Sequence, residues 1–400
     1  MQLISSRFSV QQRINLSFFI LSVATVAYSF LKSNFIELNG QCGNDGLTYC
    51  SMAQGNIEFK PFSRRTFLPF LVGIISKSHI VTTFFILNSI FLVFTAVLIY
   101  LFQSKMNSQY NLLPVSLFLL NISTFRMLFA YPVLTDFLAI FLVVLFFYLY
   151  IFFRNNSKYI FLISILIILC FVRENLSVTL SASLIISDFL LKKIKIQNII
   201  IFIISCVFTY ISFRQPSSEN FVHESNLFKV FLISIQGNFD NYETVFKLLY
   251  LTFVGLSPIA LYSFFLLRKV NNNLIPLIIF SILILISQIN LNLANPEPRL
   301  MLIPSVLMPF VFFAKTRNFR LIAILFIATF SYWDFRQFSN GKYESYLEMF
   351  GQPYLSFSFN YDQFVDRFFL FFGLLAIWVI FEVIILIKNK FFKKRSIRVN

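Results

Sequence analysis

Four groups of charged residues stand at the ends of long apolar segments, and the first combines an acid with two adjacent arginines. Asp45 lies in this group, and Arg64 and Arg65 follow it behind the dipeptide Pro61-Phe62. A positioned carboxylate can take a proton from a reacting hydroxyl. A guanidinium binds phosphate or carboxylate through a planar fork of N–H donors. The first group therefore predicts proton transfer beside a bound anion, for which phosphate is the natural candidate.

Three further groups repeat the combination of arginine and acid. Ionisable residues near membrane depth are costly, are usually paired, and indicate a functional site. The alternative interpretation is that such pairs only anchor helix ends at an interface, and the sequence leaves it open for each pair taken singly. The groups are FRMLFAYPVLTD with Arg126 and Asp136, CFVRENLS with Arg173 and Glu174, and NLANPEPRLMLIP with Glu297 and Arg299.

The composition predicts that these groups belong to a membrane protein. Of the 400 residues, 58% are hydrophobic and only 12% are charged, which is more apolar surface than a soluble domain can bury. The net charge of +16 would suggest nucleic acid for a soluble chain. Here the cations fall in short turns, such as Lys192, Lys193 and Lys195 after the sixth apolar run. This positive-inside pattern predicts that both termini are cytoplasmic. Membrane topology then accounts for the net positive charge, so we expect no nucleic-acid partner.

The apolar runs predict an all-α polytopic membrane protein with about twelve transmembrane helices. We expect one domain over residues 1–400, elaborated on its outer face by the segments 32–79, 214–247 and 333–366. Inside the first two, RTFLPFLVGIISK and SNLFKVFLISIQGNF are too short to cross and predict interfacial helices. The predicted spans are 14–31, 80–102, 112–124, 134–153, 159–172, 176–191, 199–213, 248–267, 274–293, 301–314, 321–332 and 367–387.

Cysteine and histidine restrict the chemistry further. Cys42 and Cys50 flank Asp45 on the predicted outer, oxidising face, where they are candidates for a disulfide; the alternative is two small buried apolar residues. Histidine occurs only at His79 and His223, which disfavours a histidine metal site and a Ser-His-Asp scheme. An oxygen-ligated divalent cation, Mg²⁺ or Mn²⁺, on Asp45 and another carboxylate stays open, although no Asp-x-Asp or Glu-Glu pair supports it.

These motifs resemble those of the GT-C type membrane glycosyltransferases. The resemblance rests on an acid in the first outer loop (Asp45), the following helix DGLTYCSMAQG, and a segment of the Pro-Phe-x-x-Arg type. It continues in the P-x-x-x-D pattern that ends at Asp136, in Arg173-Glu174, and in the E-x-R pattern from Glu297 to Arg299, more by architecture than by residue identity. The sequence departs from many members by its lone first-loop acid and by having no sizeable soluble C-terminal domain.

The resemblance implies a multi-pass enzyme of a bacterial inner (cell) membrane with an extracytoplasmic site. It would move a sugar from a polyprenyl-phosphate donor to a glycan, lipid or protein acceptor by direct inverting transfer, which needs a single carboxylate base. The family's first-loop acid is general base or metal ligand, which assigns the base to Asp45. We expect the donor phosphate on Arg64, Arg65, Arg173 and Arg299, with support from Arg126, Asp136, Glu174 and Glu297.

Other functions remain open at this stage. A polymerase or ligase of lipid-linked glycans also uses outer-face arginines, and its key loop would be the late segment 333–366. A solute or lipid transporter predicts inverted repeats and charges near the bilayer midplane. The sequence contains no evident repeat, and its charged groups cluster at one face. A membrane protein without catalytic activity is the remaining alternative.

Overall fold

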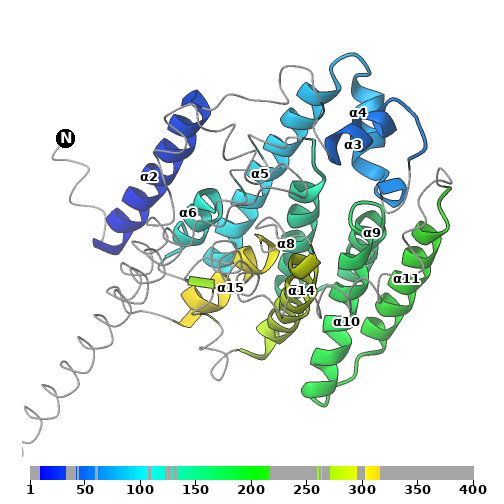
Figure 1. The fold of residues 1–400 in the computed structure, drawn as a ribbon. Helices are drawn as coiled ribbons and strands as arrows, with labels where there is room; N and C mark the ends of the chain where they lie inside the picture. The colour runs from blue at the N-terminus through cyan, green and yellow to red at the C-terminus, as the bar shows by residue number, and fades with distance from the viewer. Residues whose placement is uncertain are drawn as a thin grey trace, which may run out of the picture.

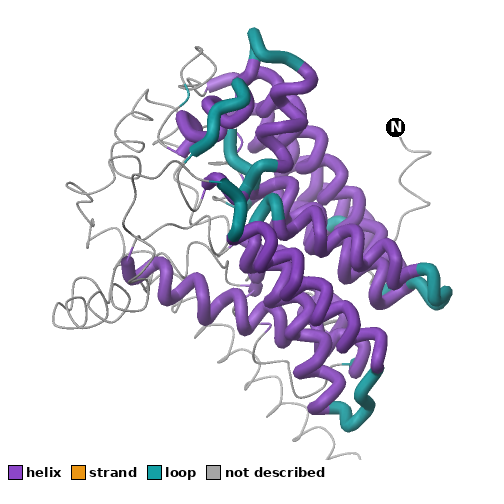
Figure 2. The backbone as a smooth tube through the Cα atoms, turned by 90° about the vertical axis from the view of Figure 1, so that its right-hand side faces the viewer, coloured by secondary structure: helices purple, strands orange, loops and turns teal. Residues whose placement is uncertain are grey.

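The regular elements that the structure describes are all helices. The computed structural model describes residues 10–32, 42, 45–58, 62–106, 110–121, 124, 128, 133–216, 259–260, 263, 271–294 and 302–315. Within these ranges there is no β-strand (Figure 2). The α-helices are α2 Val10–Lys32, α3 Asp45–Ala53, α4 Phe67–Ile75, α5 Ile80–Lys105, α6 Leu113–Leu120, α8 Asp136–Phe152, α9 Lys158–Cys170, α10 Glu174–Leu190, α11 Ile196–Phe213, α14 Ile275–Ala294 and α15 Leu302–Lys315, with short 3₁₀ turns η2 Phe62–Arg64 and η5 Asn272–Leu274.

The long helices pack side by side, and two short helices lie at one end of them. In Figure 1, α9, α10 and α11 form one flank, α2 lies on the opposite flank, and α3 and α4 sit at the upper end. Helix α5 packs on α8, and α10 contacts α9, α11 and α14. The α10–α11 turn is at the lower end in the same view. The α3–α4 pair and the α10–α11 turn therefore lie at opposite ends of the bundle.

Every predicted span that falls fully within the described helical region is a helix. The helices α2, α5, α6, α8, α9, α10, α11, α14 and α15 coincide with the predicted runs to within a few residues. Of the span 248–267 only residues 259, 260 and 263 are described, and the spans 321–332 and 367–387 lie outside the described residues. The short run RTFLPFLVGIISK contains the nine-residue helix α4, as expected, whereas SNLFKVFLISIQGNF lies outside the described residues.

Helix α6 covers only the first part of the third predicted span, 112–124; residues 122 and 123 lie outside the described residues, and Thr124 is again helical. Helix α6 begins with Pro114 in its first turn, where proline's missing N–H costs nothing. Its C-cap is Asn121, whose backbone is extended at φ −66° and ψ 127°. The Asn121 side chain donates to Ser305 Oγ of α15 over 2.8 Å. This buried hydrogen bond gives the Asn121 amide a partner on another helix. The periodicity of apolar residues could not have predicted that contact.

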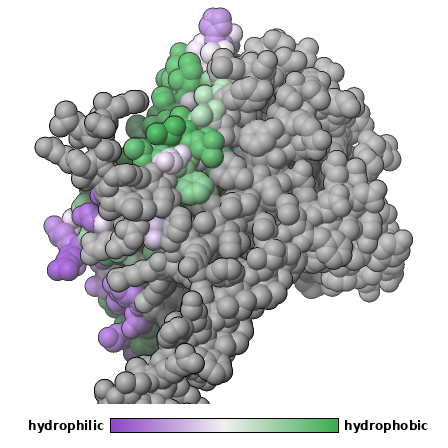
Figure 3. All heavy atoms as spheres, turned by 90° about the vertical axis from the view of Figure 1, so that its left-hand side faces the viewer, coloured by the Kyte–Doolittle hydropathy of each residue, from purple (hydrophilic) through white to green (hydrophobic). Residues whose placement is uncertain are grey.

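Two of the described helices are long and apolar enough to cross a bilayer. They are α5 and α11; elsewhere the apolar helical stretches whose side chains the structure describes are 10–17 residues long. Both expose large side chains along their length, for example Ile86 and Val93 on α5 and Ile203 and Val207 on α11. Figure 3 shows a hydrophobic band on one face of the molecule, with hydrophilic atoms beyond its two ends. Exposed apolar surface of this extent indicates association with membrane or protein.

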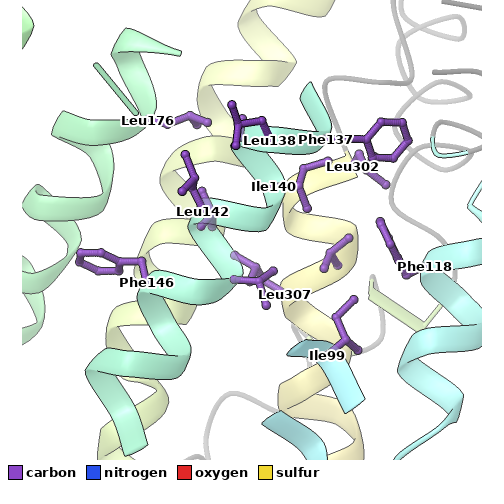
Figure 4. Packing of buried hydrophobic residues seen from close by; sticks show 14 of the residues in the cluster. Ile99, Phe118, Phe137, Leu138, Ile140, Leu142, Phe146, Leu176, Leu302 and Leu307 are labelled. Carbon is purple, nitrogen blue, oxygen red and sulfur yellow. The ribbon is translucent and has the colours of Figure 1, made fainter. Parts of the chain in front are cut away.

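The core between these helices is filled by aromatic and branched side chains. Phe102 of α5 stacks on Phe310 of α15 with ring centroids 4.2 Å apart, and Phe147 of α8 lies 5.5 Å from Phe280 of α14. Figure 4 shows Leu138, Leu142 and other α8 residues pointing into the same space as residues of α5, α10 and α15. Tight packing of this kind fixes the relative positions of the helix ends, and those ends carry the charged residues.

Helix α10 approaches its neighbours through small polar residues. Ser177 and Ser205 of α11 are joined by a 2.7 Å hydrogen bond between their hydroxyls, and Cys170 Sγ lies 3.4 Å from Thr209 Oγ1. The Ser181 hydroxyl donates to the Ser177 carbonyl of its own helix over 3.1 Å. Small residues let helix backbones come close, which holds α9, α10 and α11 in one layer.

Candidate functional site

Arg65 and Glu174 form the centre of the charged cluster at the upper end of the bundle. Arg65 Nε donates to Glu174 Oε2 over 3.3 Å, and Arg65 Nη1 donates to the Tyr49 hydroxyl, also over 3.3 Å. Their side chains are only 15% and 10% exposed. Tyr49 packs edge-on against Phe62, with ring centroids 5.4 Å apart. Three segments, namely α3, the η2 turn and the start of α10, therefore meet on one guanidinium.

A second ion pair lies one residue away along the chain. Arg173 Nη2 donates to Asp136 Oδ1. Asp136 is the first residue of α8 and Glu174 the first residue of α10, so each acid occupies the first turn of its helix. A carboxylate there is stabilised by the helix dipole and the free N–H groups. Both acids are thus suited to hold an arginine beside the helix start.

Hydrogen bonds to backbone carbonyls fix the two helix starts and the first-loop region to one another. Phe67 N donates to the Phe171 carbonyl over 3.1 Å, which joins the segment before α4 to the α9–α10 turn. Thr135 Oγ1 donates to the Val172 carbonyl at 3.5 Å. Asn88 Nδ2, within α5, donates to the Leu134 carbonyl at 2.8 Å. The arginines and acids are therefore held by a rigid frame and not by side-chain pairing alone.

Arg64 takes a different environment from its neighbour. It is 5% exposed, and its guanidinium carbon lies 3.7 Å from the centroid of the Phe213 ring at the end of α11. A guanidinium over an aromatic face is a cation–π contact that is stronger when desolvated. Arg64 thus connects η2 to α11, whereas Arg65 connects η2 to α3 and α10.

Helix α3 begins at the predicted base. Asp45 is its first residue, although the Asp45 side chain lies outside what the structure describes. Cys42 and Cys50 form the disulfide for which the sequence made them candidates. By the rise of an α-helix, Asp45 Cα lies about 6 Å along the axis from that of Tyr49, the residue that binds Arg65. The start of α3 is therefore close to the ion-pair cluster.

The described residues bring together part of the predicted site. Asp136, Arg173, Glu174, Arg64 and Arg65 all lie at this end of the bundle. Arg126, Glu297 and Arg299 lie outside the described residues, so their predicted roles are not tested.

The pairing within the site could not be read from adjacency. The sequence groups Arg173 with Glu174, but the hydrogen-bonded partners are Asp136 for Arg173 and Arg65 for Glu174. Tyr49 and Phe213 were not singled out as site residues. An interfacial tyrosine four residues after a first-loop acid gave a weak signal for Tyr49, whereas Phe213 is one of 57 phenylalanines and gave none.

Electrostatics keeps both members of the central pair charged. Burial alone would raise the pKa of Glu174, but the charge of Arg65, backbone hydrogen bonding and the charge of Arg173 together hold this pKa below its ordinary value. Burial would likewise lower the pKa of Arg65, and the interactions with Tyr49 and Glu174 outweigh it, so the pKa is raised. The pair is therefore ionised at neutral pH.

The described carboxylates of the cluster do not fit a divalent cation. Asp136 and Glu174 each bind an arginine, and Arg64 adds a third guanidinium to the same end of the bundle. Oxygen-ligated cations need several carboxylate or carbonyl oxygens that are not engaged by cations. Nowhere in the described ranges do three His, Cys, Asp or Glu side chains gather as metal ligands would. Both described carboxylates of the cluster are therefore already paired with a cation of the chain.

Comparison with known proteins adds no family to these observations. No protein-family model matches the chain, and searches of curated proteins and of solved structures found no significant match. The resemblance to GT-C glycosyltransferases therefore stays a prediction that rests on the sequence motifs.

Proposed function

We propose that the chain is a polytopic membrane glycosyltransferase with cytoplasmic termini, whose site is the charged cluster at the α3 end of the bundle. The observation that carries this proposal is the arrangement of arginines on two carboxylates beside the start of α3. A sugar linked to polyprenyl phosphate is a phosphodiester with one negative charge, which guanidinium groups bind through their planar forks of N–H donors.

The ion pairs give the cluster a way to receive this phosphate. A phosphate oxygen and a carboxylate oxygen occupy the same position in the fork of a guanidinium. Glu174 and Asp136 hold Arg65 and Arg173 in fixed directions before the donor arrives, which reduces the ordering cost of binding. The phosphate then joins or replaces a carboxylate without displacement of the arginines. Packing against Phe213 keeps Arg64 as a fixed charge at the rim of the cluster.

The transfer itself needs one base and a stabilised leaving group. Asp45 takes the proton of the acceptor hydroxyl as its oxygen bonds to the anomeric carbon of the sugar. The bond from that carbon to the phosphate oxygen breaks, and the electron pair stays on the departing polyprenyl phosphate. The phosphate charge thereby increases, so arginines bind the transition state more tightly than the donor. This is an inverting displacement that uses the single first-loop acid.

Membrane placement follows from the same arrangement. The exposed apolar flanks of α5 and α11 would face lipid, and α4, which exposes Phe70, Ile74 and Ile75, would lie in the outer interface. The prenyl chain would then lie in the membrane beside the cluster while the sugar and acceptor stay in water. An extracytoplasmic position of this end is consistent with the disulfide of Cys42 and Cys50.

The deciding experiment is transfer of radiolabelled sugar from polyprenyl-phosphate donors by membranes that contain the full chain. Asp45→Asn removes the base and should lower transfer by about 10²–10⁴-fold. Glu58→Gln is the matched control, since it removes a half-buried acid from the same loop region, and it should retain wild-type transfer. Full transfer by Asp45→Asn at equal protein level would refute the assignment of the base. Carrier binding without transfer from any donor would favour the polymerase or transporter alternatives.

A further inference from the structure

A second cationic site lies at the opposite end of α10, where two lysines from different turns converge on one tyrosine. Lys158, at the start of α9, has its Nζ 5.3 Å from the centroid of the Tyr150 ring. Lys195, in the α10–α11 turn, has its Nζ 5.8 Å from the same centroid. Lys158 Nζ also donates to the Tyr150 carbonyl over 3.3 Å. Two cations from separate segments thus lie within 6 Å of one aromatic ring.

The floor beneath these lysines is fixed by buried polar contacts. Asn198 is fully buried, and its Nδ2 donates to the Tyr150 hydroxyl at 3.3 Å and to Asp188 Oδ2 at 2.9 Å. Asp188 is 3% exposed and also accepts from the Lys195 backbone N–H at 3.0 Å. The ring and the α10–α11 turn therefore hold one geometry, which makes the lysine positions a built feature of the fold.

Among the described residues, neither lysine ammonium forms an ion pair with the carboxylate in this floor. Asp188 accepts hydrogen bonds from the Asn198 amide and from the Lys195 backbone N–H. In the described part of the chain, it makes no ion pair with Lys158 or Lys195. Burial and the nearby charge of Lys195 both lower the pKa of Lys158. The two like charges therefore repel each other, and an anion bound near both lowers that cost.

The surroundings distinguish a lipid headgroup from a free anion. Arg154, Lys192 and Lys193 are exposed around the same two turns. Interleaved with the lysines are large apolar side chains that project from the surface, with Ile194 at 69% and Ile196 at 67% exposed. A soluble anion makes no use of exposed isoleucines. The boundary between headgroups and acyl chains needs both kinds of group together.

We propose that the α8–α9 and α10–α11 turns form a binding site for an anionic phospholipid, in which Lys158 and Lys195 bind the headgroup phosphate above Tyr150. Arg154, Lys192 and Lys193 add attraction to the surrounding anionic surface, and Ile194 and Ile196 enter the acyl boundary. The site is separated from the arginine cluster by the length of α10, about 25 Å for its 17 residues. Lipid binding at this site requires no glycosyl transfer, so its test is independent of the proposed function.

The test uses the purified full chain in neutral detergent micelles. Added phosphatidylglycerol should raise the midpoint of thermal unfolding in a saturable and salt-sensitive way, while phosphatidylcholine at the same concentration should not. Inorganic phosphate at the same concentration should also have no effect. Each lysine near an anionic surface contributes about fivefold in affinity, so Lys158→Gln with Lys195→Gln should weaken the apparent phosphatidylglycerol affinity about thirtyfold.

A matched double variant controls for net charge. Lys77→Gln with Lys105→Gln removes two exposed lysines, one before α5 and one at its last residue, and should keep wild-type phosphatidylglycerol affinity. The charge-preserving pair Lys158→Arg with Lys195→Arg serves if the glutamine pair does not fold, and it should retain the salt-sensitive stabilisation. Equal stabilisation by phosphatidylcholine, full stabilisation by phosphate alone, or an equal loss in the control pair would each overturn the proposal.

Discussion

Glu174 accepts a hydrogen bond from Arg65 Nε over 3.3 Å, although 109 residues separate the two along the chain. The contact joins the first loop region to the start of α10, and Tyr49 binds the same guanidinium from α3. A single arginine thus joins α3, which begins at the predicted base, to the start of α10. The stability of the site and its ability to bind an anion depend on the same side chains.

The first prediction concerns the energetic coupling of this pair. Glu174→Gln leaves a largely buried guanidinium without its countercharge and should lower the free energy of unfolding by about 3 kcal/mol. Arg65→Gln should cost a similar amount for the same reason. The double variant should lose clearly less than both together, as a double-mutant cycle of unfolding in detergent would measure. Arg214→Gln, an exposed arginine that bonds Tyr210, is the control and should change stability by less than about 0.5 kcal/mol. Additive losses would contradict the pairing.

The second prediction is a loss of stability in acid that depends on Glu174. Its folded-state pKa is held below the ordinary value, chiefly because the charge of Arg65 outweighs the effect of burial. The ionised carboxylate therefore contributes its full stabilisation above the pKa of an unfolded glutamate, about 4.3. That contribution is lost as the pH falls through the lowered folded-state pKa. Unfolding midpoints measured from pH 6 downwards should show the loss in the wild type and a flatter profile in Glu174→Gln; identical profiles would contradict it.

The sequence predicted the helices well, because long apolar runs between polar turns leave few alternatives. The start of α5 at Ile80 and the end of α11 at Phe213 match the predicted limits. The sequence also predicted that one end of the bundle carries Arg65, Arg173, Asp136 and Glu174. Every second connection between successive spans lies on the same side of the membrane, and these residues all fall in such connections or beside them.

The contacts inside the cluster could not be predicted. Which acid meets which arginine depends on the rotation of α8 and α10 about their axes, and that rotation is set by packing such as the Ser177–Ser205 contact. The burial of Arg64 on Phe213 depends on where α11 ends relative to η2, a distance between segments that no local pattern encodes. Apolar periodicity reports that a face is buried but not which neighbour buries it.

The third prediction separates two roles of Arg173. Under the proposed function Arg173 binds the donor phosphate, so Arg173→Ala should lower sugar transfer by about a hundredfold. Arg173→Lys keeps the charge but loses the planar fork, so it should recover stability more fully than transfer. Transfer rates and unfolding midpoints of both variants test this. Asp136→Asn, which removes the partner carboxylate, should lower stability in the same assay, and parallel recovery of stability and transfer by lysine would reduce Arg173 to a structural role.

The fourth prediction concerns the close approach of α3 and α4. A Cβ on Gly73 would lie 2.2 Å from the Ala53 carbonyl oxygen, a backbone atom that cannot yield without moving α3. Gly73→Ala should therefore destabilise the chain by about 1–3 kcal/mol and lower transfer, because α3 carries Asp45 and Tyr49. Ile74→Ala, at a 66% exposed neighbouring position, is the control for effects on α4 itself. Wild-type unfolding of Gly73→Ala in detergent would show that α3 and α4 are farther apart.

The fifth prediction concerns the disulfide that encloses the start of α3. Cys42 and Cys50 are eight positions apart, and closing a loop of that length stabilises a fold by about 2 kcal/mol in the chain-entropy account. Asp45 lies inside the loop, and Tyr49 is adjacent to Cys50. Cys50→Ser should therefore lower both stability and transfer, because the first turn of α3 is no longer tied to the segment before it.

Cys206→Ser, which removes a free cysteine from α11, is the control and should change neither stability nor transfer by a comparable amount. Addition of a reductant should reproduce the Cys50→Ser loss in the wild type and leave the Cys50→Ser variant unchanged. Sensitivity of that variant to reductant would place the effect on another thiol.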